Sequence, residues 1–129
     1  MPALQESCIA LLSKTAIADL SSVAETTVYT VPIGKTCILT ESWLKVAADV
    51  GASLAFTIGQ DGAETDWLNT QNGDNLDDPL DCSIFKPVAS ATPPTLKEYV
   101  AGELIKFAVT AGGNAVAGTF YLFGFLDDA

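Results

Sequence analysis

The strongest constraint on this chain is an alternation of apolar and other side chains with a period of two, which recurs along most of the sequence. Successive side chains of an extended strand point to opposite faces, so this alternation places every second residue on one face of a sheet. The clearest case is the run at residues 52–58, where Leu54, Phe56 and Ile58 share a face. No segment combines a sustained helical period with capping residues at both ends. The sequence therefore predicts an all-β fold.

Short breaks of turn-like composition separate the alternating runs. Residues 48–51 divide a run at 37–46 from the run at 52–58, and residues 111–114 divide a run at 105–109 from the last one at 116–126. Such breaks between two alternating runs are typical of antiparallel hairpins, so we expect two hairpins. Many short strands with evenly spaced turns favour an antiparallel β-sandwich, and the length suits a jelly roll.

The length predicts a single β-sandwich domain over residues 1–129, because a chain of this size can bury roughly two thirds of its unfolded surface around one core. The N-terminal residues 1–20 are ambiguous. Leu4, Cys8 and Leu11 match a helical spacing, whereas the apolar run at residues 8–12 also suits a buried strand. We favour an extended arm or a first strand for this segment.

Charge and composition exclude several classes of function. The formal net charge is −10, which repels phosphate and anionic lipid headgroups, so we expect neither a nucleic-acid partner nor a membrane partner. The sequence has no histidine, which excludes Ser-His-Asp and Cys-His catalysis and removes the commonest zinc ligand. Glycoside hydrolysis needs only two carboxylates, but nothing in the sequence specifies such a pair. We predict that the chain is no enzyme and uses no cofactor.

The cysteines and the N-terminus bear on the cellular compartment. Cys8, Cys37 and Cys82 are an odd number at wide spacing, which argues against a disulfide framework and a metal cage. We expect reduced, mostly buried thiols. Glu6 precedes the first apolar run without a basic cluster, which is unlike a secretory signal, so we expect synthesis and retention in a cytoplasm.

An acidic loop is the one candidate metal site, and it contains Asp74, Asp77, Asp78 and Asp81. Calcium takes six to eight oxygen ligands, which such a loop could offer. The spacing lacks the alternate ligand positions, the central glycine and the final glutamate of an EF-hand. We therefore favour a solvated acidic loop without a metal, and keep calcium binding as the alternative.

Aromatic side chains are the candidate interface residues. In the last run Phe120, Leu122 and Leu126 fall on one face, and Tyr121, Phe123 and Phe125 fall on the other. A strand covered on one face only alternates with polar residues, so the second face needs cover from another element or another subunit. The predicted interface comprises Trp43, Trp67, Phe120, Tyr121, Phe123 and Phe125.

The two tryptophans have different neighbours in the sequence. Trp43 shares its face with Glu41 and Lys45, which indicates a semi-exposed surface. Trp67 precedes a stretch with the polar residues Asn69, Gln71 and Asn72. An aromatic ring beside hydrogen-bonding side chains is also what a carbohydrate-binding groove uses, so a receptor- or carbohydrate-binding module stays open as the alternative.

Several segments resemble small virion proteins of tailed bacteriophages. The resemblance begins at residues 27–36, continues through residues 37–45, and includes the segments 59–61 and 66–68. Its last part covers residues 99–103, 110–113 and 118–126. It spans most of the chain from about residue 26 and rests on strand and turn sequences, with no catalytic residue to carry over.

The resemblance implies a jelly-roll or related β-sandwich in the class of capsid decoration, or cement, proteins. Such proteins are often trimers on the outer surface of the icosahedral shell, so the expected partners are the major capsid protein and two further copies of this chain. The expected location is the outer capsid surface of the virion, after synthesis in the cytoplasm of the host bacterium. Similar sandwiches also occur in necks, tails and fibres, where the receptor-binding alternative would apply.

Overall fold

The computed structural model describes residues 8–86 and 97–129, and these residues form β-strands and connecting turns without a helix. The strands are β1 (Ala10–Ile17), β2 (Glu25–Thr30), β3 (Lys35–Val46), β4 (Ala55–Gln60), β5 (Ala63–Asn72), β6 (Cys82–Phe85), β7 (Glu98–Val100), β8 (Leu104–Ala111) and β9 (Gly118–Asp128). The all-β prediction is confirmed. A first strand, β1, lies in the N-terminal segment, and residues 1–7 of the expected arm lie outside the described residues. The described part of the chain contains no helix that could cross a membrane.

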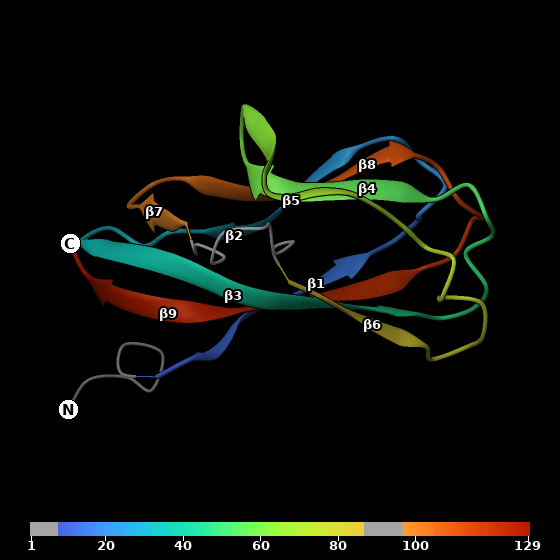
Figure 1. Ribbon diagram of the computed structural model, residues 1–129, viewed down its shortest axis with the longest axis horizontal. Coiled ribbons are helices and arrows are strands. Elements are labelled where there is room, and N and C mark those ends of the chain that lie inside the picture. The colour runs from blue at the N-terminus through green and yellow to red at the C-terminus, as the bar shows by residue number, and fades with distance from the viewer. Residues whose placement is uncertain (1–7, 87–96) are drawn as a thin grey trace, which may run out of the picture.

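The strands form two antiparallel sheets that pack face to face (Figure 1). Sheet A has the order β1-β9-β3-β6, and β7 pairs with β3 farther along the edge that β6 occupies. Sheet B has the order β2-β8-β4-β5. The predicted antiparallel β-sandwich is confirmed.

The two expected hairpins are wrong, because each break in the sequence connects strands of different sheets. β3 belongs to sheet A and β4 to sheet B, and likewise β8 belongs to sheet B and β9 to sheet A. The two connections meet at one end of the sandwich, where the backbone N–H of Asn114 donates to the Val50 carbonyl at 2.7 Å. In each pair, β3 with β4 and β8 with β9, both strands have an apolar face. Because the chain passes from one sheet to the other between them, these apolar faces pack against each other in one core.

The strand neighbours show how the chain is wound. The pairs β4–β5, β3–β6, β2–β8 and β1–β9 are adjacent, alternately in sheet B and in sheet A. The chain is therefore a long antiparallel ribbon with its tip at the β4–β5 hairpin, wound so that successive parts of the ribbon lie in opposite sheets. This winding brings the last strand, β9, to the middle of sheet A between β1 and β3.

The core lies between the sheets and is joined by aromatic rings. The Phe107 ring of sheet B contacts the Phe120 ring of sheet A at 5.1 Å between centroids, and it contacts Phe56 at 5.0 Å. Cys37 is also fully buried here, and its burial raises the pKa of its thiol to about 12. A thiol with such a pKa stays protonated at neutral pH, so Cys37 acts as a small apolar side chain.

A polar joint connects the sheets beside β7. Asp66 of β5 accepts hydrogen bonds from the hydroxyl of Tyr99 at 2.8 Å and from the backbone N–H of Gln60 at 3.1 Å. It also pairs with the Lys97 ammonium group at 2.7 Å. Burial and the bond to Asp66 raise the pKa of Tyr99, which is fully buried, so the phenol is the donor in this joint.

Candidate interaction surface

The outer side of sheet A carries four aromatic side chains, Trp43, Tyr121, Phe123 and Phe125, which we call the aromatic face. Tyr121, Phe123 and Phe125 alternate along β9 with buried inward residues, as the sequence predicts. Trp43 joins them from the neighbouring strand β3. All four side chains are half-buried, although the strands that carry them lie in the middle of the sheet. Their own sheet leaves them partly open to solvent.

The strand register makes this surface continuous across sheet A. Tyr121 pairs with Lys14 of β1 on one side and with Trp43 of β3 on the other, and Trp43 in turn pairs with Ile84 of β6. The Trp43 and Phe123 rings are 4.4 Å apart between centroids, and the Trp43 and Tyr121 rings are 5.9 Å apart. Aromatic pairs at these distances shield one another, which accounts for their partial burial.

Exposed aliphatic side chains extend the aromatic face on both sides. Leu11 of β1, which pairs with Phe123, is 41% exposed, and Ile84 of β6 is 61% exposed. Ile38 of β3 pairs with Phe125 at the far end. An apolar surface that runs across several strands is typical of a contact with another protein, whereas single exposed apolar residues are common on any surface.

Charged side chains lie among the aromatic residues. The Trp43 indole N–H donates to Glu41 at 2.8 Å, so a partner could cover the ring without leaving this donor unpaired. The ammonium groups of Lys14 and Lys45 lie 5.8 Å and 5.9 Å from the centre of the Tyr121 ring. Cations at this distance from an aromatic face are attracted to it. One end of the aromatic face is thus positively charged in a protein of strongly negative net charge.

Two predicted interface residues lie elsewhere, which corrects their assignment. Phe120 is fully buried in the core, and Trp67 is 5% exposed. The Trp67 indole N–H donates to the Leu39 carbonyl of β3 at 3.2 Å, which ties sheet B to sheet A. Both side chains therefore stabilise the fold and are not available to a partner. Trp67 is close to the polar residues Asn69, Gln71 and Asn72 only in sequence, because its own side chain is buried between the sheets.

The stretch proposed for carbohydrate binding thus lacks its aromatic platform. Gln71 and Asn72 line a mostly polar hollow of about 540 Å³, together with the exposed Cys82 and the beginning of β6. The expectation of mostly buried thiols is wrong, because among the three cysteines only Cys37 is buried, while Cys8 is half-buried and Cys82 is exposed. Partial burial still raises the pKa of the Cys82 thiol, and the nearby charge of Lys45 opposes this shift. No disulfide joins the three cysteines, all of which lie in the described ranges.

The predicted acidic loop brings three of its four aspartates together. The carboxylates of Asp77, Asp78 and Asp81 lie within 4.8 Å of one another, and the backbone N–H of Asp78 donates to Asp81 at 3.0 Å. Asp74 instead lines a separate hollow of about 270 Å³ together with Asp49 and Asp77. The grouped aspartates are largely exposed, as in a solvated loop, and calcium binding stays the alternative.

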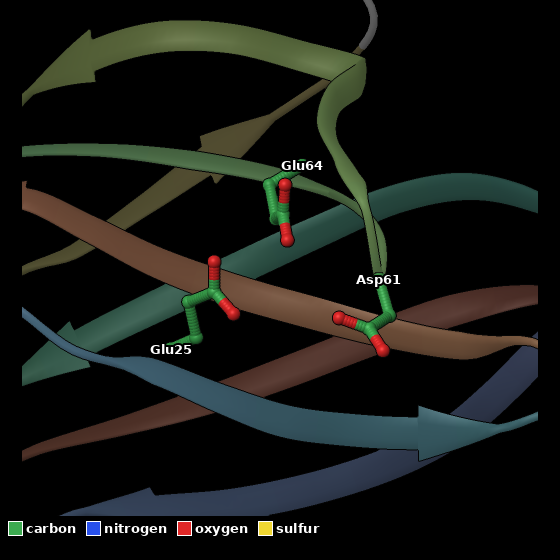
Figure 2. A group of neighbouring side chains, drawn as sticks. All are labelled: Glu25, Asp61 and Glu64. Carbon is green, nitrogen blue, oxygen red and sulfur yellow. The ribbon is translucent and has the colours of Figure 1, made fainter.

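A second cluster of acidic side chains lies on the outer side of sheet B, and the sequence did not indicate it. Figure 2 shows Glu25, Asp61 and Glu64, whose carboxylates lie within 4.8 Å of one another. Gly59 makes this possible, because a Cβ there would lie 2.5 Å from the Ala63 carbonyl oxygen. The beginning of β5 therefore crosses the outer side of β4 and carries Glu64 toward Glu25 on β2. Two separate segments contribute these acids, because Asp61 and Glu64 belong to the β4–β5 hairpin and Glu25 belongs to β2. Local spacing could therefore not have indicated the whole group.

The two glutamates of this group differ in their affinity for a proton. A hydrogen bond to Glu64, then burial and the charge of Glu64, raise the pKa of Glu25. Backbone N–H groups, first that of Gly62 at 3.0 Å, lower the pKa of Glu64. Lys106 lies close to both glutamates and donates to the Thr27 hydroxyl at 2.7 Å. A proton bound by this pair therefore resides on Glu25 rather than on Glu64.

Comparison with known proteins gives similarity at the level of fold. No family model matches the sequence, and no curated protein matches it. A chain of the acidic stable capsid structure of Helicobacter pylori bacteriophage KHP30 superposes with a TM-score of 0.60 at 12% identity, over 93% of this chain and 89% of that one. A chain of the cyanophage Pam1 capsid asymmetric unit gives a TM-score of 0.57 at 10% identity, over 96% of this chain and 87% of that one. The β-sandwich described above is thus a fold that also occurs in phage capsids.

Proposed function

We propose that this chain is a structural protein of a phage virion that binds the outside of the assembled capsid, contacts the major capsid protein and stabilises the shell. The observation that carries the proposal is the aromatic face, an apolar surface that the described part of the chain leaves partly open. The likeness of the fold to chains of two phage capsids supports it. The wound ribbon of alternating sheets is the arrangement expected of a jelly roll.

The physical argument for a cement role is mass action. A protein that binds the assembled shell, and not its separated subunits, lowers the free energy of the assembled state. A contact of standard size covers on the order of 800 Å² on each partner, and removing apolar area from water contributes roughly 25 cal/mol per Å². The aromatic face offers partly exposed apolar side chains for such a contact. The net charge of −10 disfavours the DNA-filled inside of a shell.

The remaining parts of the proposal follow from the same role. We expect a homotrimer that attaches to the shell through the aromatic face, and synthesis in the cytoplasm of the host bacterium. We expect no catalytic activity, since a cement protein needs only affinity.

The test adds purified protein to shells that lack it and measures bound protein by sedimentation and shell disruption by heating. Phe125→Glu, which places a charge on the aromatic face, should reduce binding at least tenfold and remove the gain in heat resistance. Thr110→Glu is the matched control, because Thr110 is exposed on the outer side of β8 in sheet B. Binding should survive moderate salt, since apolar burial is screened little.

Equal heat resistance of shells with and without bound wild-type protein would overturn the cement role. Imaging that places the protein only on the tail would instead favour the receptor-binding alternative. In that case the polar hollow beside Gln71 and Asn72 would be the first place to look for a sugar.

A further inference from the structure

One turn of the chain holds an exposed leucine in a backbone conformation that glycine normally occupies. Leu80 has a φ of 69°, and the other described residues with positive φ are all glycines. A branched side chain is strained in this conformation, because its Cβ crowds the following carbonyl oxygen. The Leu80 turn, residues 78–81, is closed by a bond from the Asp81 N–H to the Asp78 carbonyl at 3.2 Å. The turns at residues 32–35 and 100–103 have the same closing bond and carry glycine at the corresponding position.

The fold itself gains little from the Leu80 side chain, which is 72% exposed. The backbone of the turn is held by two bonds to the end of β3, from the Leu80 N–H to the Val46 carbonyl at 2.9 Å and from the Val46 N–H to the Asp81 carbonyl at 3.0 Å. A glycine at residue 80 would keep both bonds and remove the strain. Strained residues concentrate at functional sites, so the surroundings of this side chain are the place to look for one.

Leu80 lines a largely apolar hollow of about 200 Å³ at one end of sheet A, which we call the Leu80 hollow. Its other lining residues come from the end of β3, the beginning of β9 and the residues beside them, namely Lys45, Val46, Ala47, Ala117, Gly118 and Thr119. Sites for whole small molecules usually have roughly 300–1,000 Å³. The Leu80 hollow is smaller than that, and its size and lining suit a single apolar side chain.

The Leu80 hollow adjoins the aromatic face. Lys45 and Thr119 pair across β3 and β9, and Trp43 and Tyr121 pair two residues farther along the same strands. Side chains two residues apart on a strand lie on the same side of the sheet, so the hollow and the aromatic face form one continuous surface. The Lys45 ammonium group lies 5.9 Å from the centre of the Tyr121 ring, at the boundary between them.

Charges of both signs flank the Leu80 hollow. Lys45 lines it, and Asp78 and Asp81 belong to the Leu80 turn. Because these groups lie side by side on one surface, their charges offset one another in part. The distinguishing property of the hollow is therefore its apolar lining, and a side chain that enters it binds by removing apolar area from water.

We propose that the Leu80 hollow takes one apolar side chain of the major capsid protein when the aromatic face lies against the shell, with Leu80 as one wall of the site. The inference rests on the proposed function for the identity of this partner. An anchor side chain that fills a pocket within a wider contact is the usual form of a binding hot spot. The strained conformation of Leu80 then has a function, because a glycine would leave the hollow open on one side.

The first test is Leu80→Gly, with shell binding measured by sedimentation and stability by thermal unfolding. Shell binding should weaken at least tenfold, whereas the melting temperature of the free protein should stay equal or rise, because the backbone strain is relieved. A purely structural role of Leu80 would not produce this combination. Ile33→Ala is the matched control, since Ile33 is 96% exposed in the turn at residues 32–35, beside the opposite end of β3, and should leave shell binding unchanged. A Leu80→Gly protein that binds shells like wild type would overturn the inference.

The second test needs no shell and uses N-acetyl-leucine amide as a probe. Titration of the wild-type protein, followed by NMR, should shift the amide resonances of Ala47, Leu80 and Gly118, which line the hollow. N-acetyl-asparagine amide is the control probe, because its side chain has a similar size and is polar. Leu80→Gly should reduce the shifts at Ala47 and Gly118. No shift with the leucine probe, or equal shifts with the two probes, would refute an apolar site.

Together the two tests separate this inference from the cement role. Wild-type protein that binds the leucine probe but no shell would overturn the cement role and, with it, the capsid protein as the source of the side chain. Wild-type protein that binds shells, with a Leu80→Gly variant that binds them equally and no response to the probe, would overturn the Leu80 hollow alone.

Discussion

The outer sides of the two sheets differ in polarity, whereas their inner sides are both apolar. The inward residues of β8 and β9 are uniformly apolar, and both series are buried. The outward series of β8 contains Lys106 and Thr110, whereas that of β9 contains Tyr121, Phe123 and Phe125. The outer side of sheet B carries polar side chains, and the β4–β5 hairpin projects from this side (Figure 1). Sheet A keeps an apolar outer side, which points to a partner outside the chain.

The largest expected effect is a difference in stability between substitutions on the inner and the outer side of β9. Phe120→Ala empties a fully buried site between the sheets and should lower the free energy of unfolding by about 3–5 kcal/mol. Phe123→Ala removes a half-buried ring from the aromatic face and should cost only about 1 kcal/mol. Urea unfolding at a concentration where the protein is monomeric measures both values.

The proposed difference between the two sides of β9 is wrong if Phe120→Ala and Phe123→Ala lower the free energy of unfolding by the same amount. Equal losses would mean that Phe123 is core, and that the outer side of sheet A is not held open for a partner. Weakened shell binding by Phe123→Ala with near-normal stability is the result we expect.

We expect an intermediate loss of stability from a substitution at Gly59, where the β4–β5 hairpin crosses β4. Gly59→Ala would place a Cβ 2.5 Å from the Ala63 carbonyl oxygen, so the hairpin must move away, at a cost of about 1–3 kcal/mol. Gly118→Ala is a milder control, because the nearest atom would lie 3.2 Å away. Hydrogen exchange should quicken at residues 60–66 in Gly59→Ala and stay unchanged in sheet A. Unchanged exchange in the hairpin would show that this crossing does not depend on Gly59.

The smallest expected effect concerns acid. The pKa of Glu25 is raised in the folded protein, so its ionised form opposes folding and this penalty disappears as the pH falls through that pKa. Glu25→Gln should therefore raise the melting temperature slightly at pH 7, and the difference from wild type should shrink toward pH 4. Glu98→Gln, a change at an exposed glutamate of β7, is the control. A gain that grows in acid would contradict the assignment.

Alternation along single strands made much of this fold predictable. The period of two in residues 120–126 separates the inward Phe120 and Leu122 from the outward Tyr121 and Phe123, as observed. Trp43 lies on a mixed face with Glu41, again as its neighbours in sequence indicate. These features depend only on the pleat of one strand, which a sequence displays directly.

Features that depend on pairing across the molecule were not predictable. A break such as residues 48–51 signals a change of direction, but it does not say whether the next strand joins the same sheet. Trp67 sits beside polar residues in sequence, yet its partner, the Leu39 carbonyl, comes from the other sheet. Glu25 and Glu64 meet only because the hairpin crosses β4 at Gly59. The positive φ of Leu80, 69°, was not predictable either, because glycine is the residue that usually takes this conformation.

One edge of sheet A is formed by two short strands, β6 and β7, and this arrangement hinders the addition of further strands from other chains. β6 and β7 are only four and three residues long, and both pair with the same side of β3. The Leu39 carbonyl lies between the two paired stretches and already accepts the Trp67 indole N–H. A long, flat edge with unpaired carbonyls invites another chain to add a strand and begin a fibril, and short or occupied edges discourage it. The edge of sheet A at β6 and β7 therefore offers no long stretch of β3 to which a further strand could add.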